Sequence, residues 1–206
     1  MGDASHIHSD SGPNPNPRFA HQNQHMALEK WKFDTVHSSV SFSVRHLMIS
    51  RVHGSFKTWS GALETDEANH ANSKVQVTIE AASIDTKEPQ RDEHLRSADF
   101  FDAANHPNIT FESTSVKKVD SEHYEITGNL AIRGASKPVT LDTEFFGRQK
   151  DPWGGERAGF SAKTSIDRRD FGLTFNIPLE GGGFVVGEKV DITLDVQAVK
   201  ETAAAA

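Results

Sequence analysis

The chain has 206 residues, a net charge of −7 and no cysteine, which suits one domain with a sizeable core and a tail. The acidic balance disfavours nucleic acid as a partner, because it repels phosphates. The lack of cysteine excludes disulfides, thiolate metal ligands and a cysteine nucleophile.

The two ends of the chain differ from its middle. We expect residues 1–25, which are polar and irregular, to be a disordered leader or tag before a natural start at Met26. Residues 26–200 are expected to form a single domain, and residues 201–206 a C-terminal tail. No stretch approaches the ~20 apolar residues of a membrane-spanning helix or the ~7–15 of a signal-peptide core. The sequence as written predicts a cytoplasmic protein, with a periplasmic one as the alternative if the leader replaced a signal peptide.

Strand signals dominate from Trp31 onward, because apolar and polar residues alternate with a period of two. The expected strands cover residues 40–45, 52–58, 75–80, 109–113, 124–132, 139–145, 158–166 and 190–197. Polar or glycine-rich turns are expected at residues 66–72, 120–122, 134–137, 151–155 and 181–183.

The strand order predicts an all-β fold, an eight-stranded antiparallel barrel. Short connections without helices indicate an antiparallel meander, and closure of eight strands on themselves removes exposed edges. The interior of such a barrel holds its own side chains or one slim ligand. Small residues among the large ones hint at open space inside, namely Ala81, Gly128, Ala131, Ala158 and Ala162.

One short helix near residues 87–102 is expected to interrupt the strands as a lid or plug at one end of the barrel. Asp85 or Thr86 is a suitable N-cap, and Pro89 is harmless in the first turn. The aromatic pair 100–101 is expected to wedge the end of this helix against the barrel.

Three further motifs contain residue types that can carry chemistry. The glycine-rich segment 182–189 lacks the lysine position and the following helix of a phosphate loop, which favours a hairpin loop. The histidines are favoured as hydrogen-bonding groups over metal ligands, namely His37, His46, His53 and His94. The segment 167–170 favours ion pairing in a turn, with an inward-turned arginine that meets a ligand as the alternative.

An ordered set of motifs covers most of residues 31–199. It includes Asp34-x-x-His37-Ser38, Val52-x-Gly54-x-Phe56, Arg91-Asp92-x-His94-Leu95, Asp99-Phe100-Phe101-Asp102, Pro107-x-Ile109-x-Phe111, Ile132-Arg133-Gly134, and Asp167-Arg168-x-Asp170-Phe171-Gly172. With these motifs the chain resembles the YceI-like, polyisoprenoid-binding family.

The resemblance implies a lipocalin-like barrel that holds a long lipid in an elongated apolar pore, with no cofactor, no metal and no catalytic residue to carry over. The implied ligand is a polyprenyl phosphate or alcohol, an isoprenoid quinone or a fatty amide. The function it predicts is therefore binding, storage or transport of a long-chain isoprenoid lipid, without enzymatic activity.

Alternation within the strands selects candidate ligand-binding residues, with the alternative that these apolar side chains face an outer helix or a partner. Those expected to line the pore are Val40, Phe42, Val44, Phe56, Val77, Ile79, Phe111, Leu130, Ile132, Phe160, Ile166, Ile192 and Leu194. Those expected to meet a headgroup at its mouth are His46, Arg91, His94 and Arg168, with Asp92 and Asp170 to orient these cations.

Two functions of other classes stay open on the residues alone. One is an enzyme that acts on a lipid headgroup, with His94 and either Asp92 or Asp170 as base and acid. The other is a ligand-free interaction module with a solid barrel. The expected partners are an amphipathic lipid, a membrane in transient contact, and a second copy in a homodimer if Trp31, Trp59 or Trp153 is exposed.

Overall fold

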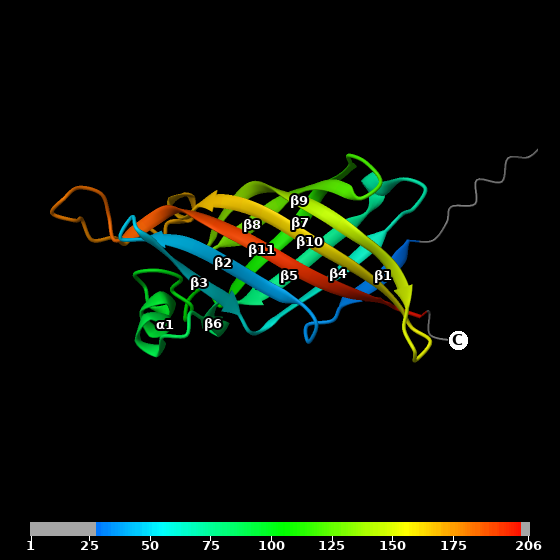
Figure 1. The fold of residues 1–206 in the computed structure, drawn as a ribbon, viewed down its shortest axis with the longest axis horizontal. Coiled ribbons are helices and arrows are strands. Elements are labelled where there is room, and N and C mark those ends of the chain that lie inside the picture. The colour runs from blue at the N-terminus through cyan, green and yellow to red at the C-terminus, as the bar shows by residue number, and fades with distance from the viewer. Residues whose placement is uncertain (1–27, 203–206) are drawn as a thin grey trace, which may run out of the picture.

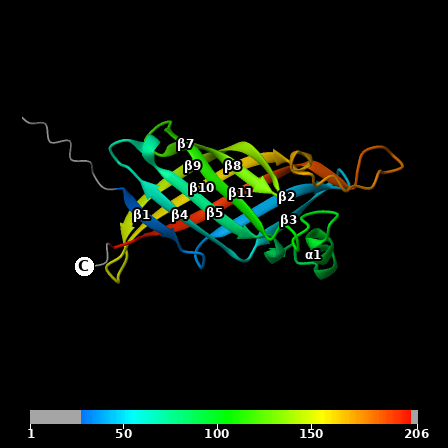
Figure 2. The same ribbon diagram turned by 180° about the vertical axis from the view of Figure 1, so that it is seen from behind.

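The computed structural model describes residues 28–202, and one antiparallel sheet dominates it (Figures 1 and 2). Its strands are β1 (Glu29–Phe33), β2 (Ser39–His46), β3 (Ser50–Phe56), β4 (Trp59–Thr65), β5 (Lys74–Glu80), β6 (Ile84–Asp85), β7 (Asn108–Lys118), β8 (His123–Ile132), β9 (Ala135–Lys150), β10 (Glu156–Asp167) and β11 (Val186–Lys200). The helical elements are α1 (Pro89–Arg96) and the 3-10 turns η1 (His70–Asn72), η2 (Ala81–Ser83) and η3 (Arg168–Phe171).

The sheet closes into a barrel because β1 and β2 both pair with β11. β1 pairs next with β4, and β2 with β3, so β1–β2 and β3–β4 act as two long, kinked strands. β5 and β6 continue this pattern by pairing with β4 and β3. With the other strands, the barrel has eight continuous strands in meander order, which confirms the predicted all-β, eight-stranded antiparallel barrel.

Each of the eight expected strands falls in a different one of these eight, but the extension β4 was not predicted. Its inward positions are Trp59, Gly61 and Leu63, and the glycine in the middle breaks the apolar alternation. A Cβ at Gly61 would lie 2.4 Å from Phe33 Cδ2, so the ring of the neighbouring strand takes the space that a side chain would fill. The sequence pattern of β4 is therefore interrupted by a packing contact between strands, which a local repeat does not reveal.

The predicted short helix is confirmed, although its bounds differ from the expected ones. The expected N-cap at Asp85 or Thr86 is wrong, because the Glu88 carboxylate accepts the Gln90 N–H at 3.4 Å. The helix ends at Arg96, since Ser97 is extended, with φ −69° and ψ 172°. Successive turns then carry the chain from α1 back to the barrel.

Candidate functional site

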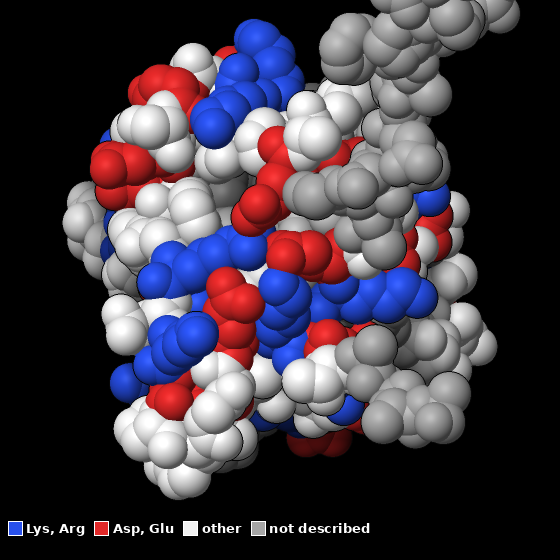
Figure 3. All heavy atoms as spheres, turned by 90° about the vertical axis from the view of Figure 1, so that its right-hand side faces the viewer, with Lys and Arg blue, Asp and Glu red and all other residues white. Residues whose placement is uncertain are grey.

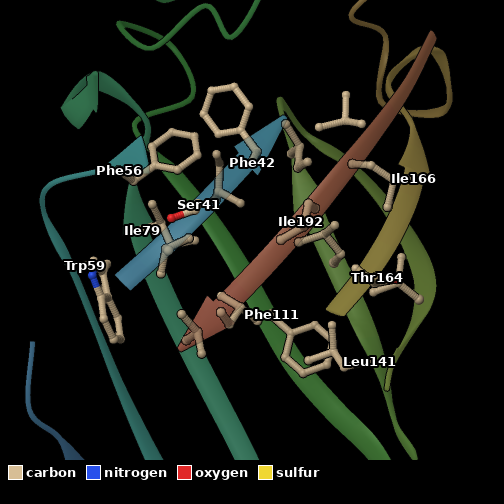
Figure 4. Close-up of a pocket in the computed structure, with 18 of the residues that line it drawn as sticks. Ser41, Phe42, Phe56, Trp59, Ile79, Phe111, Leu141, Thr164, Ile166 and Ile192 are labelled. Carbon is tan, nitrogen blue, oxygen red and sulfur yellow. The ribbon is translucent and has the colours of Figure 1, made fainter. Parts of the chain in front are cut away.

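A cavity of about 240 Å³ lies inside the barrel, and its wall is almost entirely apolar (Figure 4). Figure 4 shows Phe42, Ile166 and Ile192, from three different strands, around the same space. The polar residues in the lining are Ser41, Thr143, Thr164 and Arg168. Ligand pockets commonly have ~300–1,000 Å³, so this cavity lies close to the lower limit of that range.

All thirteen residues that alternation selected for the pore border this cavity, because strict alternation sends every second residue inward. These are Val40, Phe42, Val44, Phe56, Val77, Ile79, Phe111, Leu130, Ile132, Phe160, Ile166, Ile192 and Leu194. Their contact with a ligand stays a prediction.

Sequence reasoning missed other residues of the lining. Val75, Val190 and Val196 share strand parity with selected neighbours, so alternation alone could have found them. Others come from segments outside the expected strands, namely Phe33, Trp59, Leu63, Ile84, Leu95, Phe171 and Leu173. For these no sequence signal was available, because only the closure of the barrel brings them to the cavity.

Glycines in the wall seat aromatic rings and do not open space. A Cβ at Gly54 would lie 2.3 Å from Phe42 Cζ, and one at Gly128 would lie 2.5 Å from Phe111 Cζ. Each ring therefore lies against the backbone of the next strand, a close approach that only glycine permits. The expectation that Gly128 marks a void is wrong, whereas Ala162 does border the cavity.

Trp31 closes the end of the barrel that faces away from α1. It is 1% exposed, and its Nε1 donates to Thr65 Oγ1 at 3.1 Å. The Arg148 guanidinium carbon lies 4.8 Å from the centre of the indole, and Lys200 Nζ lies 5.6 Å from it. We call this the closed end.

A network of ion pairs surrounds the indole, because both cations that lie against it also pair with carboxylates. Arg148 lies 2.8 Å from Glu29 and 2.9 Å from Glu67, while Lys200 contacts Glu29 and lies 3.2 Å from Glu156. Figure 3 shows basic and acidic side chains interleaved over this face of the molecule. Such a surface opposes passage of an apolar chain, because the charged groups would have to lose water and partners.

Two tryptophans expected on the surface are buried. Trp31 is 1% and Trp59 is 8% exposed, whereas Trp153 in the β9–β10 turn is 83% exposed. The suggested dimer contact through Trp31 or Trp59 is therefore wrong, because both side chains pack inside the barrel.

Asp34 joins two turns at the closed end. Its Oδ2 accepts from His37 Nδ1 at 2.9 Å and from Arg157 NH1 at 2.7 Å. Arg157 also donates from Nε to Asp151 Oδ2 at 2.9 Å. These hydrogen bonds to His37 and Arg157 lower the pKa of Asp34 from 3.8 to about 2.

At the opposite end, aromatic side chains pack between α1 and the barrel. Phe101 lies edge-on to Phe56, with ring centres 5.9 Å apart, and Phe100 lies 5.2 Å from Phe175. Leu95 of α1 and both members of the pair 100–101 border the cavity. The helix thus covers part of this end, which we call the α1 end.

Arg168 is buried at the α1 end and borders the cavity. Its guanidinium donates to the backbone carbonyls of Gly187 at 2.9 Å, of Phe175 at 3.0 Å, and of Leu173. The ion pairing expected in this turn belongs to Arg169, which lies 2.5 Å from Asp167. Arg168 therefore holds the loop before β11 in place, and its contact with a headgroup stays a prediction.

The structure does not gather the other predicted mouth residues into one cluster. Arg91 donates to Thr86 Oγ1 at 2.8 Å, and the buried Asp92 accepts from the Thr86 N–H at 2.9 Å. His94 Nε2 lies 3.0 Å from Asp99 Oδ2. Asp92 is linked to Arg91 through the Thr86 hydroxyl, which donates to Asp92 and accepts from Arg91. Its role in orienting a headgroup cation stays a prediction.

In the part of the chain that the structure describes, His46 and Asp170 make no side-chain hydrogen bond with Arg91, Asp92 or His94. His46 is half-buried at the end of β2, opposite Val186, and Asp170 is exposed. Within residues 28–202, no three metal-binding side chains come together, and no helix is long and apolar enough to cross a bilayer.

Comparison with known proteins identifies relatives of this barrel. A model of the YceI-like domain family matches residues 31–198. Protein YceI of Escherichia coli O157:H7 is 44% identical over 165 residues, which cover 80% of this chain and 83% of the relative.

Solved structures of similar proteins have the same fold. The Campylobacter jejuni YCEI protein matches with a TM-score of 0.65 and 37% identity over 77% of this chain and 90% of its own. A polyisoprenoid binding domain from Saccharophagus degradans matches with a TM-score of 0.61 over 83% of this chain and 98% of its own. At 14% identity, the second likeness concerns the fold alone.

Proposed function

The chain belongs to the YceI-like family, and we propose that it binds and carries a long-chain isoprenoid lipid in the barrel cavity. The observation that carries this proposal is the continuous apolar lining of a closed barrel, which leaves about 240 Å³ free. A barrel that acts only through its outer surface does not need an open apolar interior. The polyisoprenoid binding domain of the same fold supports the choice of ligand class.

The energetics of transfer favour a carrier over a permanent store. Each methylene taken from water gains ~0.8 kcal/mol, so a long chain needs cover outside a membrane. A membrane already keeps the chain dry, so exchange between bilayer and barrel is nearly balanced. The protein can then load and unload without a large input of free energy.

The headgroup belongs at the α1 end in this proposal. The closed end is sealed by Trp31 and its ion pairs, so the tail points toward Trp31 and the polar group toward α1. A quinone, an alcohol or a phosphate could occupy this position, with Arg168 as the nearest buried cation of the lining. Selectivity then comes from the length and width of the cavity.

The two alternative functions lose support. The enzyme needs His94 in contact with Asp92 or Asp170, but His94 pairs with Asp99 and Asp92 bonds Thr86. The solid interaction module is contradicted by the cavity itself.

Extraction of gently purified protein with organic solvent, followed by mass spectrometry, tests the proposal. We expect a long-chain lipid in stoichiometric amount. Protein that yields no lipid and takes up no added isoprenoid would overturn the proposal.

A cavity-filling variant gives a matched test. Ala162→Phe adds a ring to the lining and should reduce lipid content several-fold, because the lumen is narrow. Lys163→Phe, at the exposed neighbouring position, should load like the wild type. Equal loading of both variants would exclude this cavity as the lipid site.

A further inference from the structure

The α1 end carries a group of large apolar side chains that are exposed to solvent. Ile49 is 86%, Ile177 53%, Met48 52%, Phe184 46% and Leu47 38% exposed. We call these five residues the apolar tip. Most single exposed apolar residues need no explanation, but a contiguous group marks a contact surface.

The tip is one surface built from two segments far apart in the sequence. The β2–β3 turn carries its first three residues, and the loop before β11 carries the other two. The Leu47 N–H donates to Val185 O at 2.8 Å, and Met48 Cγ lies 3.4 Å from a Cβ position at Gly183. Figure 1 shows the loop, the β2–β3 turn and α1 at the same end of the barrel.

The backbone holds the tip in a defined shape. Pro178 forms a bridge with Phe184, and the Val185 N–H donates to Ile177 O at 3.0 Å. In the other segment, Leu47 and Met48 have φ values of 51° and 63°. Such a turn favours asparagine and glycine, so the two bulky apolar residues occupy it against the backbone preference.

The tip is continuous with the entrance side of the cavity. Val44, three residues before Leu47, borders the cavity, and so does Val186, two residues after Phe184. The opposite end of the barrel is covered by ion pairs. The molecule therefore has a charged end and an apolar end, and the cavity lining reaches the apolar one.

We propose that the apolar tip inserts into the surface of a lipid bilayer and thereby brings the α1 end of the cavity against the membrane. This proposal rests on the proposed function and names where the lipid enters and leaves. Apolar side chains that insert to the level of the acyl chains gain free energy, as in peripheral proteins. A second copy is the weaker occupant, because five side chains on protruding turns offer far less than the ~800 Å² per partner of a stable interface.

Charge around the tip predicts how the protein responds to lipid composition. Arg45 is exposed beside it on β2, and within residues 28–202 it has no carboxylate within the 4.0 Å of an ion pair. Glu180 in the other segment is exposed and offsets this charge. Binding should therefore depend on apolar insertion and change little with salt.

The test measures flotation of the full chain with vesicles of phosphatidylcholine and phosphatidylethanolamine. The double variant Ile49→Ser with Phe184→Ser should lower the bound fraction at least about tenfold, because both side chains leave the acyl region. Trp153→Ser is the matched control, since it removes an aromatic side chain that lies far from the tip and is more exposed than Phe184. It should float like the wild type.

A second readout separates this proposal from the proposed function. Uptake of dansyl-undecanoic acid from solution, followed by its fluorescence, reports on the cavity without a membrane. We expect the tip variant to bind the probe like the wild type but to receive it from vesicles at least about tenfold more slowly.

Each outcome decides one proposal. If the tip variant floats with vesicles as well as the wild type does, membrane docking is overturned. It is also overturned if the wild type does not float but forms a dimer in light scattering that the tip variant does not form. Absence of probe uptake by all variants would count against the cavity, whatever the flotation shows. A misfolded variant is detected by its near-ultraviolet circular dichroism, and Ile49→Ser alone, at a side chain 86% exposed, then gives the answer.

Discussion

The guanidinium carbon of Arg148 lies 4.8 Å from the centre of the Trp31 ring, and this pair closes one end of the barrel. The two residues come from β9 and β1, at opposite sides of the sequence. Their contact, with the ion pairs around it, gives the barrel two unlike ends, because charged groups cover this end while α1 and its aromatic neighbours lie at the other.

Trp31→Ala should destabilise the protein strongly. The side chain is 1% exposed, and removal of a buried tryptophan costs ~3–5 kcal/mol in the free energy of unfolding. Urea unfolding followed by circular dichroism measures the loss. Trp153→Ala, at a side chain 83% exposed, should stay within ~0.5 kcal/mol of the wild type. Equal effects of the two changes would contradict the role of Trp31 in closing the barrel.

Asp34 should make stability depend on pH in acid. Its pKa is about 2 in the folded protein, against an ordinary 3.8, so the folded state binds the proton less readily than the unfolded state. The stabilisation is complete above the unfolded pKa and is lost as pH falls from about 4 through about 2.

Asp34→Asn removes this carboxylate and should flatten that part of the curve. Urea midpoints measured for both proteins between about pH 5 and about pH 2 check the prediction. Curves that stay parallel through this window would show that the Asp34 contacts with His37 and Arg157 contribute nothing.

Gly54→Ala should push the Phe42 ring into the lumen. The added methyl group would lie 2.3 Å from Phe42 Cζ, so the ring has to move, at a cost of ~1–3 kcal/mol. Both unfolding free energy and uptake of dansyl-undecanoic acid should fall. Gly181→Ala, where the methyl group meets nothing within 4 Å, is the control and should stay within ~1 kcal/mol. Unchanged uptake in Gly54→Ala would argue that Phe42 does not border the lipid.

Asp92→Ala should loosen α1. The buried carboxylate accepts the Thr86 N–H at 2.9 Å and the Thr86 hydroxyl at 2.5 Å, and a buried donor without a partner costs ~1–3 kcal/mol. The increase in the rate of amide hydrogen exchange over the wild type should be larger in α1 than in β7–β11. Glu93→Ala, at an exposed carboxylate on α1 itself, is the control. Uniform acceleration over the whole chain would indicate global destabilisation instead.

Much of the barrel could be predicted because alternation is a local property. Val40, Phe42 and Val44 alternate with polar residues, and this pattern gives both the strand and the residues that share its apolar face. The alternation is weaker where a glycine occupies an inward position, as at Gly61. The space beside that glycine is filled by Phe33, which comes from another strand. The N-cap of α1 was predicted wrongly for a similar reason. The N–H and the hydroxyl of Thr86 both donate to Asp92, so Thr86 does not cap the helix.

Candidate mouth residues were harder to place than lining residues. Arg168 and Arg169 are neighbours with the same charge, yet one is buried among backbone carbonyls and the other pairs with Asp167. Composition cannot distinguish two such neighbours, because the choice depends on where the loop before β11 returns to the barrel.

The order of apolar and polar residues along this chain determined by itself that eight strands form and which side chains share one face of each strand, since both follow from a repeat of two residues. Only the tertiary structure decided that the apolar faces turn inward, that one end is sealed over Trp31, and that Leu47 is hydrogen-bonded to Val185 at the other. The reason is physical: closure of a barrel brings together residues more than a hundred positions apart, and no local repeat carries information about that distance.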